Sequence, residues 1–416
     1  MEGEEGVSVI STVVPATPRS EGNGECELRW MELIMKLHYI RAVYFFTSEA
    51  AQGLSISDLK KNMFPLLDRV PRLVSGRIRI SESGQPVIKC NDAGVRVAES
   101  HRHCTLREWF QQHGCSLEGL VPDHVLGGPD LAFSPLVFLK FTWFECGGLC
   151  VGLSWSHILG DAFSAFNFMA EWSQIRAPTR IAHTLSPKPK LKLQSPPHNG
   201  NPISVKIATT TGELWLPTTR AKIVTHTFHV TPKQLNLLTT SRTTATSSYF
   251  KTLSAFVWSH VAHIRGESEP RAVTVVTHGG EGLVLSSVEA SFAVAESDMA
   301  ELARVIGEEK REEEVVEEGG GGGGERGDFV VYGANLTFVD LESGDDLYGV
   351  VLNGHKPVVA NCCIHGVGDE GVVLVLPAPE GVGGGRMVTV SLAEEEVEQL
   401  KDKLRREWGI ESLPFS

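Results

Sequence analysis

The distribution of apolar and polar positions predicts strands and helices that alternate along most of the chain. Apolar residues at helical spacing indicate helices at 56–67, 162–172, 231–239, 248–265 and 392–408. Short apolar or alternating runs indicate strands at 77–80, 85–89, 135–142, 150–155, 329–331, 336–339, 357–364 and 371–376. Ser55 or Ser57 can cap the first helix, and a run of glutamates suits the beginning of the last one. This mixture predicts an α/β (α+β) protein.

Two changes in composition interrupt the pattern. The segment 177–202 is rich in proline and lysine and lacks helical spacing, which predicts a linker that we extend to residue 215. The chain would then consist of one domain at 1–176, the linker at 177–215 and a second domain at 216–416. The acidic segment 308–327 contains consecutive glycines, whose backbone entropy favours a disordered surface loop, and it lacks the motifs of a phosphate-binding loop.

Composition narrows the class of protein. The 416 residues suffice for two domains, and 42% of them are hydrophobic. A formal net charge of -13 argues against nucleic acid as the main partner. The eight scattered cysteines are typical of reduced, buried thiols in an intracellular protein, and no zinc-ligand spacing accompanies them. The acidic N-terminus does not look like a signal peptide, and no apolar run is long enough to predict a transmembrane helix.

The segment SWSHILGDAF contains the most interesting candidate chemistry. It places His157 and Asp161 at the turn between a predicted strand and a predicted helix. With 15 histidines in the chain, composition alone supplies roughly half an occurrence of a His-x-x-x-Asp spacing. The pair could be a catalytic base with its orienting partner. Alternatively, Asp161 caps the following helix and His157 ends the strand, which is the reading that the residues alone favour.

A second His-x-x-x-Asp occurs at His365 and Asp369, where neighbouring glycines predict a tight turn rather than chemistry. His260 and His263 share the polar side of a predicted helix, which indicates a solvated surface. We therefore expect no metal site.

The segment SWSHILGDAFSAFNF resembles the BAHD superfamily of plant acyl-CoA-dependent acyltransferases, and the resemblance extends over almost the whole chain. Within that superfamily the chain is most similar to the Eceriferum/Glossy branch of wax-biosynthesis proteins. The segments that carry this similarity are MKLHYIRAVYFF, DHVLGGPDLAFSPLVFLKFTWFECGGLCVGLSWSHILGD, YGANLTFVDL and NGHKPVVANCCIHGVGDEGVVLVLP. The resemblance implies two chloramphenicol-acetyltransferase-like domains, each a mixed sheet with flanking helices, joined by a crossover loop.

The resemblance also assigns roles to residues. It implies that His157 is a general base that removes a proton from an acceptor, that Asp161 holds the loop in shape, and that acyl-CoA is a substrate rather than a permanently bound cofactor. The chain departs from the family at its second signature, D-F-G-W-G, because residues 351–355 read VLNGH. Of the family's T-S-W segment only Thr337 remains, as a candidate residue of the coenzyme side.

Two main functions follow from this resemblance, and a third is a soluble acyl-CoA carrier whose tunnel binds but does not react. The branch implies an accessory protein of very-long-chain fatty-acid elongation for cuticular wax, with the condensing enzyme of the endoplasmic-reticulum elongase as its partner. The alternative is an acyltransferase that moves an acyl group to a hydroxyl or amine acceptor with His157 as the base. In either case we expect a monomer in the cytoplasm, associated with the cytoplasmic face of the endoplasmic reticulum.

Overall fold

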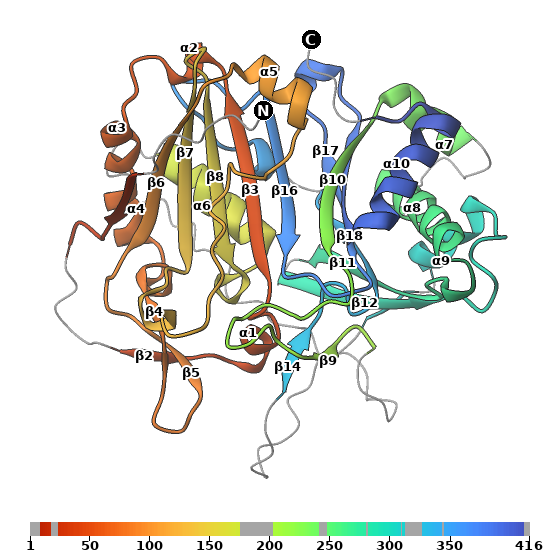
Figure 1. Cartoon of the computed structure of the whole chain (residues 1–416), viewed down its shortest axis with the longest axis horizontal. Helices are drawn as coiled ribbons and strands as arrows, with labels where there is room; N and C mark the ends of the chain where they lie inside the picture. The colour runs from red at the N-terminus through yellow and green to blue at the C-terminus, as the bar shows by residue number, and fades with distance from the viewer. Residues whose placement is uncertain are drawn as a thin grey trace.

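Two large β-sheets and the helices packed against them organise the chain (Figure 1). The computed structural model describes residues 9–17, 24–174, 203–240, 248–279, 282–308, 310–312, 327–342 and 345–411. Strands and helices mix in both halves, which confirms the predicted α/β (α+β) class.

The central strands of the first sheet are buried on both faces. Its order is β1 (Val9–Val13), β6 (Val95–Arg102), β7 (Val137–Phe144), β8 (Leu149–Ser156), β3 (Tyr39–Phe46) and β16 (Val359–His365). On β3, Ala42 and Tyr44 pack in one hydrophobic cluster, while Val43 and Phe45 pack in another. Side chains alternate between the two faces of a strand, so a strand covered on both faces reads as a continuous apolar run.

Helices cover the two faces of this first sheet unequally. One cluster includes α6 (Ala162–Gln174), α2 (Ser48–Ala51), α3 (Ile56–Lys61) and α4 (Met63–Arg69), and the opposite one includes α5 (Leu106–His113). Trp172 on α6 is fully buried and donates from its indole nitrogen to the carbonyl of Leu59 over 3.0 Å. A buried tryptophan contributes a large apolar area, and its N–H requires such a partner.

The second sheet carries its helices on one side (Figure 1). Its order is β10 (Ile223–Val230), β18 (Arg386–Ala393), β17 (Val372–Pro377), β15 (Leu336–Asp340), β11 (Ala272–Gly279), β12 (Gly282–Glu289) and β13 (Arg311–Glu312). The helices in its core are α7 (Pro232–Thr240), α8 (Tyr249–Arg265), α9 (Met299–Glu308) and α10 (Glu394–Trp408).

Shorter elements complete the described chain. Two small sheets contain β2 (Glu25–Glu27), β5 (Pro86–Lys89) and β4 (Arg77–Ile80), and β9 (Lys206–Ala208) with β14 (Asp328–Val330). The other helical segments are α1 (Trp30–Ile34), η1 (Arg72–Ser75), η2 (Leu131–Phe133), η3 (His157–Leu159), η4 (Gly266–Ser268), η5 (Asp345–Tyr348) and η6 (Glu380–Val382).

Strand β16 joins the two halves of the chain. Although it comes late in the sequence, it pairs antiparallel with β3, so that His365 lies opposite Tyr39. The fully buried side chain of Asn361 on β16 donates to the carbonyl of Cys115 (2.8 Å) and to the hydroxyl of Thr227 on β10 (2.9 Å). Because an unpaired buried amide is costly, these bonds fix how the edges of the two large sheets meet.

The predicted elements are confirmed at most positions, with differences at their ends. The helix predicted at 56–67 is divided at Asn62, and Ser55 rather than Ser57 caps it by accepting from the amide of Asp58. The strands that were not predicted are β1, β2, β3, β6, β9, β10, β11, β12, β13 and β18. Their runs are apolar on both faces or interrupted by polar residues, so neither period is clear in the sequence.

The two predicted interruptions differ from the structure where it describes them. Residues 203–215 of the predicted linker pack against the chain, since the amide of Trp215 donates to the carbonyl of Leu126 over 2.8 Å. Of the predicted loop at 308–327, Glu308 ends α9, and Arg311 and Glu312 pair with β12. Residues 177–202, 309 and 313–326 lie outside the described residues, and the domain boundaries stay a prediction.

Candidate functional site

The end of strand β8 positions His157. All of β8 is buried, and η3 begins immediately after it at His157, whose amide donates to the carbonyl of His38 over 3.0 Å. Gly160 then turns the chain with φ 144° and ψ 177°, a conformation open essentially only to glycine. A Cβ atom there would lie 2.6 Å from the hydroxyl of Ser164. The predicted strand, turn and helix are therefore present.

Asp161 is the N-cap of α6 and uses both of its carboxylate oxygens. Oδ1 accepts from the amide of Ser164 (2.9 Å) and from its hydroxyl (3.0 Å), while Oδ2 lies 3.1 Å from Nδ1 of His278 on β11. Burial raises the pKa of Asp161, but the hydrogen bonds from His278 and Ser164 outweigh it, so the pKa lies below its ordinary value. Asp161 thus ties η3 and α6 to the second sheet.

The imidazole of His157 contacts a tyrosine that the sequence did not single out. Its Nε2 lies 3.0 Å from the hydroxyl of Tyr332, which comes from the turn between β14 and β15. His157 is 6% exposed and Tyr332 is 2% exposed. Burial lowers the pKa of His157 and raises that of Tyr332, so both groups are neutral near pH 7. Nε2, the nitrogen that a general base would present to an acceptor, is therefore already hydrogen-bonded to Tyr332.

His38 lies beside His157 and Tyr332, and the sequence analysis did not single it out. Its Nδ1 lies 2.8 Å from the carbonyl of Gly366, which can only accept, so Nδ1 carries the hydrogen. Its Nε2 accepts from the amides of Val331 (3.0 Å) and Tyr332 (3.4 Å). Burial, with a smaller effect of the charge of His157, lowers the pKa of His38 to about 3. A single fully buried, neutral imidazole therefore joins three segments that are remote in sequence.

Thr337, the candidate residue of the coenzyme side, is fully buried on β15. Its hydroxyl donates to the carbonyl of Asn335 (2.8 Å) and accepts from the amide of Gly333 (3.2 Å). Both hydrogen-bonding functions of the hydroxyl are used inside the chain. The structure therefore gives it a role in shaping the turn that carries Tyr332.

The segment 351–355, which replaces the second family signature, forms a tight turn. Leu352 and His355 exchange both of their backbone hydrogen bonds, with Asn353 at φ 50° and Gly354 at φ 85°. Two successive residues with positive φ favour the sequence Asn-Gly. The side chain of Asn353 donates to the carbonyls of Ala50 and Gln52. This turn therefore anchors to the first half of the chain through contacts of its own.

The remaining candidate residues are those of the second His-x-x-x-Asp and the pair His260 and His263. The backbone of the second motif reaches the site, because the carbonyl of Gly366 accepts from His38 and the amide of Gly368 donates to the carbonyl of Tyr332 over 2.9 Å. Asp369 forms the expected turn, where its carboxylate accepts from the amide of Arg220 over 2.6 Å. His260 is 7% exposed, so the prediction of a solvated pair is wrong for it. The reason is that Phe256 and α10 pack over that side of α8.

Three further findings concern metal ligands, thiols and membrane-spanning helices. No group of three or more His, Cys, Asp or Glu side chains among the described residues is arranged to hold a metal ion. All eight cysteines are free thiols, as predicted, but Cys146 is exposed and Cys26 and Cys104 are partly so. In the described part of the chain no helix is long and apolar enough to cross a membrane.

Comparison with known proteins identifies the class to which this fold and site belong. The profile described as the Transferase family matches residues 7–278, and the chain belongs to this BAHD transferase family. Protein ECERIFERUM 2 of Arabidopsis thaliana is 40% identical over 430 residues, which cover 97% of this chain and 99% of that protein. Protein ECERIFERUM 26-like of the same species is 37% identical over 407 residues, with 95% and 94% covered.

A solved structure shares the fold at much lower identity. TRI101 of F. sporotrichioides, crystallised with coenzyme A and T-2, has a TM-score of 0.66 and 15% sequence identity, with 94% of this chain and 99% of that chain covered. This likeness confirms the predicted acyltransferase fold and shows that a protein with this fold binds coenzyme A.

Proposed function

We propose that this chain promotes very-long-chain fatty-acid elongation for cuticular wax as an accessory of the elongase condensing enzyme, without using His157 as a base. The observation that carries the proposal is the 3.0 Å contact between His157 Nε2 and the buried hydroxyl of Tyr332. A general base needs its free nitrogen within about 2.6–3.2 Å of the proton that it removes. Tyr332 already takes that place.

The hydrogen bond from Tyr332 to the imidazole of His157, rather than the charge of that imidazole, supports the accessory function. A neutral imidazole suits a base, and burial keeps His157 neutral. An acceptor hydroxyl could reach Nε2 only after the phenol of Tyr332 moved away, and Tyr332 is 2% exposed, while its backbone amide donates to His38 over 3.4 Å. The similarity to the ECERIFERUM proteins supports the branch and its role in wax. The accessory role places the protein at the cytoplasmic face of the endoplasmic reticulum.

An acyl-CoA-dependent acyltransferase is the alternative, and one observation favours it. His157 and Asp161 keep the strand, turn and helix of the family motif, with Asp161 fixed by Ser164 and His278. In that function His157 would deprotonate an acceptor hydroxyl or amine, which would attack the thioester of the acyl-CoA. Tyr332 would then have to release Nε2 when the acceptor binds.

Replacement of His157 distinguishes the two functions. In yeast that carries the plant condensing enzyme, we expect His157→Ala to leave the yield of elongated acyl chains within about twofold of the unsubstituted protein, because no proton transfer is lost. Chain lengths are measured by gas chromatography, and protein abundance by immunoblot. His157→Gln is the matched variant, since its amide can still bond Tyr332 but cannot act as a base.

Physical association provides the second measurement. The accessory role requires that the chain co-purify or cross-link with the condensing enzyme. Loss of elongation in both His157 variants at normal abundance would favour the acyltransferase instead. Failure to associate with the condensing enzyme would exclude the accessory role.

A further inference from the structure

Two thiols of the small three-stranded sheet lie next to each other. Cys26 on β2 and Cys90, which directly follows β5, have their Sγ atoms 3.7 Å apart, although 64 residues separate them in the sequence. Both are free thiols. Among the described residues, this is the one hydrogen-bond contact that joins two thiols.

The register of β2 and β5 explains why the two thiols meet. Cys26 lies opposite Ile88, and the amide of Cys90 donates to the carbonyl of Gly24 over 3.0 Å, so the pairing continues past the end of β5. Because side chains alternate along a strand, Ile88 and Cys90 point to the same face as Cys26.

A disulfide needs only a small further approach of the two sulfurs. Its sulfur–sulfur distance is about 2.0 Å, so the Sγ atoms, now 3.7 Å apart, have to approach by about 1.7 Å. Strand β2 has three residues and lies at the edge of its sheet. A slight shift of this short edge strand, together with rotation of the two side chains, supplies that approach.

The surroundings of the two thiols suit them to different steps. Cys26 is partly exposed, so a dissolved oxidant can reach it, whereas Cys90 is 8% exposed. Burial, and then the hydrogen bond to Cys26, raises the pKa of Cys90 to about 11. Because the thiolate is the reactive form, a thiol with a raised pKa is the poorer first nucleophile. Cys26 is therefore suited to meet the oxidant, and Cys90 to attack the product.

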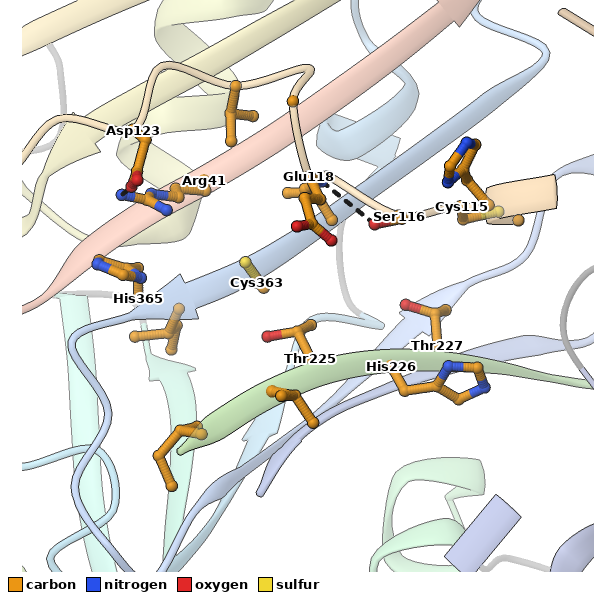
Figure 2. Close-up of a pocket in the computed structure, with 18 of the residues that line it drawn as sticks. Arg41, Cys115, Ser116, Glu118, Asp123, Thr225, His226, Thr227, Cys363 and His365 are labelled. Atoms are coloured by element: carbon orange, nitrogen blue, oxygen red, sulfur yellow. Dashed lines mark hydrogen bonds and ion pairs between the residues drawn. The ribbon is translucent and has the colours of Figure 1, made fainter. Parts of the chain in front are cut away.

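Two other thiols have surroundings of a different kind. Figure 2 shows Cys115 and Cys363 apart from each other on the lining of a cavity of about 400 Å³, where the edges of the two large sheets meet. Arg41 and His365 line the same cavity. Both thiols are buried, and burial raises the pKa of Cys115 to about 12 and that of Cys363 to about 11. Buried thiols in such surroundings are inert.

We propose that Cys26 and Cys90 form a reversible disulfide when the protein meets hydrogen peroxide. The thiolate of Cys26 attacks one oxygen of the peroxide, the oxygen–oxygen bond breaks, and Cys26 becomes a sulfenic acid while water leaves. Cys90 then attacks the sulfenic sulfur, the sulfur–oxygen bond breaks, and a second water leaves. The two sulfurs lose two electrons, which reduce the peroxide, and the two thiol protons end in the two water molecules.

The bond fixes the segment that leads to the candidate site. Strand β2 is followed closely by α1, which contacts η3, the segment that begins at His157. Trp30 of α1 also packs edge to face against Phe329 of β14, with the ring centroids 5.0 Å apart. A disulfide between residues far apart in sequence restricts the unfolded chain and so stabilises the folded one. The inference does not rest on the proposed role in elongation, because it needs neither a base at His157 nor a partner protein.

Peroxide treatment of the purified full-length chain tests the proposal. The protein is reduced, freed of reductant, treated with a small molar excess of hydrogen peroxide, alkylated and digested with trypsin, which cleaves between the two cysteines. Mass spectrometry should find a peptide pair linked through Cys26 and Cys90 that dithiothreitol separates. In urea the yield of this pair should fall by about tenfold or more, because only the folded chain holds the two thiols together.

Substitutions assign the two steps. In Cys90→Ser, Cys26 should stop at the sulfenic acid, which dimedone traps. In Cys26→Ser, oxidation of Cys90 should be slower by about tenfold or more, since the partly exposed thiol is gone. Cys146→Ser removes an exposed thiol and is the matched control, which should change the yield of the Cys26–Cys90 bond by less than about twofold.

Thermal unfolding provides the second readout. The midpoint of the oxidised chain should lie about 3 °C or more above that of the reduced chain, because the bond closes a long loop. This increase should be absent from Cys26→Ser.

Three results would overturn the proposal. Oxidation confined to other cysteines, without the linked peptide pair, would exclude the disulfide. Equal yields of the pair in folded and urea-unfolded protein would show that the fold does not bring the thiols together. Equal midpoints of the oxidised and reduced chains would exclude the fixing of β2. Should Cys90→Ser fail to fold, the peptide pair and its comparison in urea still decide the question, because both use the unsubstituted chain.

Discussion

The two His-x-x-x-Asp segments share a spacing and differ in almost everything else. At residues 157–161 the motif joins β8 to α6, so Asp161 caps a helix and His157 is buried against Tyr332. At residues 365–369 the motif joins β16 to β17, and Asp369 accepts from a backbone amide in a turn, while His365 lines the cavity between the sheets. The element that follows the motif, rather than the spacing, decides what the two side chains do.

His38 connects the two segments and should have the largest effect. Its carbonyl accepts from the amide of His157, and its ring bonds Gly366 and two amides of the Tyr332 turn. His38→Leu leaves the carbonyl of Gly366 and the amides of Val331 and Tyr332 without their partner. We therefore expect the free energy of unfolding to fall by about 4 kcal/mol. Urea denaturation followed by tryptophan fluorescence measures it. His260→Leu is the control, because the ring of His260 hydrogen-bonds the carbonyl of Phe256 in its own helix and otherwise lies 3.7 Å from the exposed carboxylate of Glu407. Equal losses would contradict the connecting role.

The second-largest expected effect is the difference between Asp161 and Asp369 in their contribution to stability. Asp161 is buried and holds Ser164 and His278, whereas the side chain of Asp369 is 31% exposed and pairs with the exposed Arg220. We expect Asp161→Ala to cost about 2–3 kcal/mol, which combines a lost helix cap with a lost buried bond. Asp369→Ala should cost less than about 1 kcal/mol. Thermal unfolding of the two variants side by side makes the comparison, and similar costs would show that context does not separate the copies.

The pH dependence of stability tests the burial of His365. Burial, and then the charge of Arg41, lowers the pKa of His365 to about 3, against about 6.5 in an unfolded chain. Between these values the unfolded chain binds a proton that the folded chain does not, so stability falls as the pH falls from 6.5 towards 3. This histidine contributes a slope of about 1.4 kcal/mol per pH unit at most.

The matched variant for this effect is His365→Gln. Its free energy of unfolding, measured from pH 7 to pH 4, should decline less steeply than that of the unsubstituted chain, by about one proton. An unchanged slope would mean that His365 takes up its proton in the folded state as readily as in the unfolded one.

The sequence was informative where a local pattern decides the structure. The strand predicted at 77–80 is β4, and the turn and helix after β8 are as expected, because Gly160 and Asp161 act on their immediate neighbours. The strand β3 was missed, since its apolar residues fill both faces of a covered sheet and show no period of two. The burial of His260 was missed because α10, far along the chain, supplies the cover.

In the candidate site, too, the sequence identified some of the residues and missed others. The motif and the family resemblance identify His157 and Asp161. Tyr332 lies 175 residues beyond His157 and begins the segment YGANLTFVDL, which carries the resemblance but was given no role for its tyrosine. His38 stands at the beginning of an apolar run, where a histidine looks like an ordinary boundary residue. Its role depends on Gly366, where a Cβ would lie 2.0 Å from the carbonyl of Leu37, so only glycine lets the chains approach.

The amino-acid sequence by itself determined the α/β class, the acyltransferase family and the strand, turn and helix that hold His157, because each depends on local periodicity, capping or a long continuous resemblance. Only the tertiary structure decided that Tyr332 hydrogen-bonds the imidazole of His157, that His38 joins both motif segments, and that Arg41 and His365 line the same cavity. These contacts join residues far apart in sequence. Their energies come from burial and from hydrogen bonds that exist only after the two sheets have met.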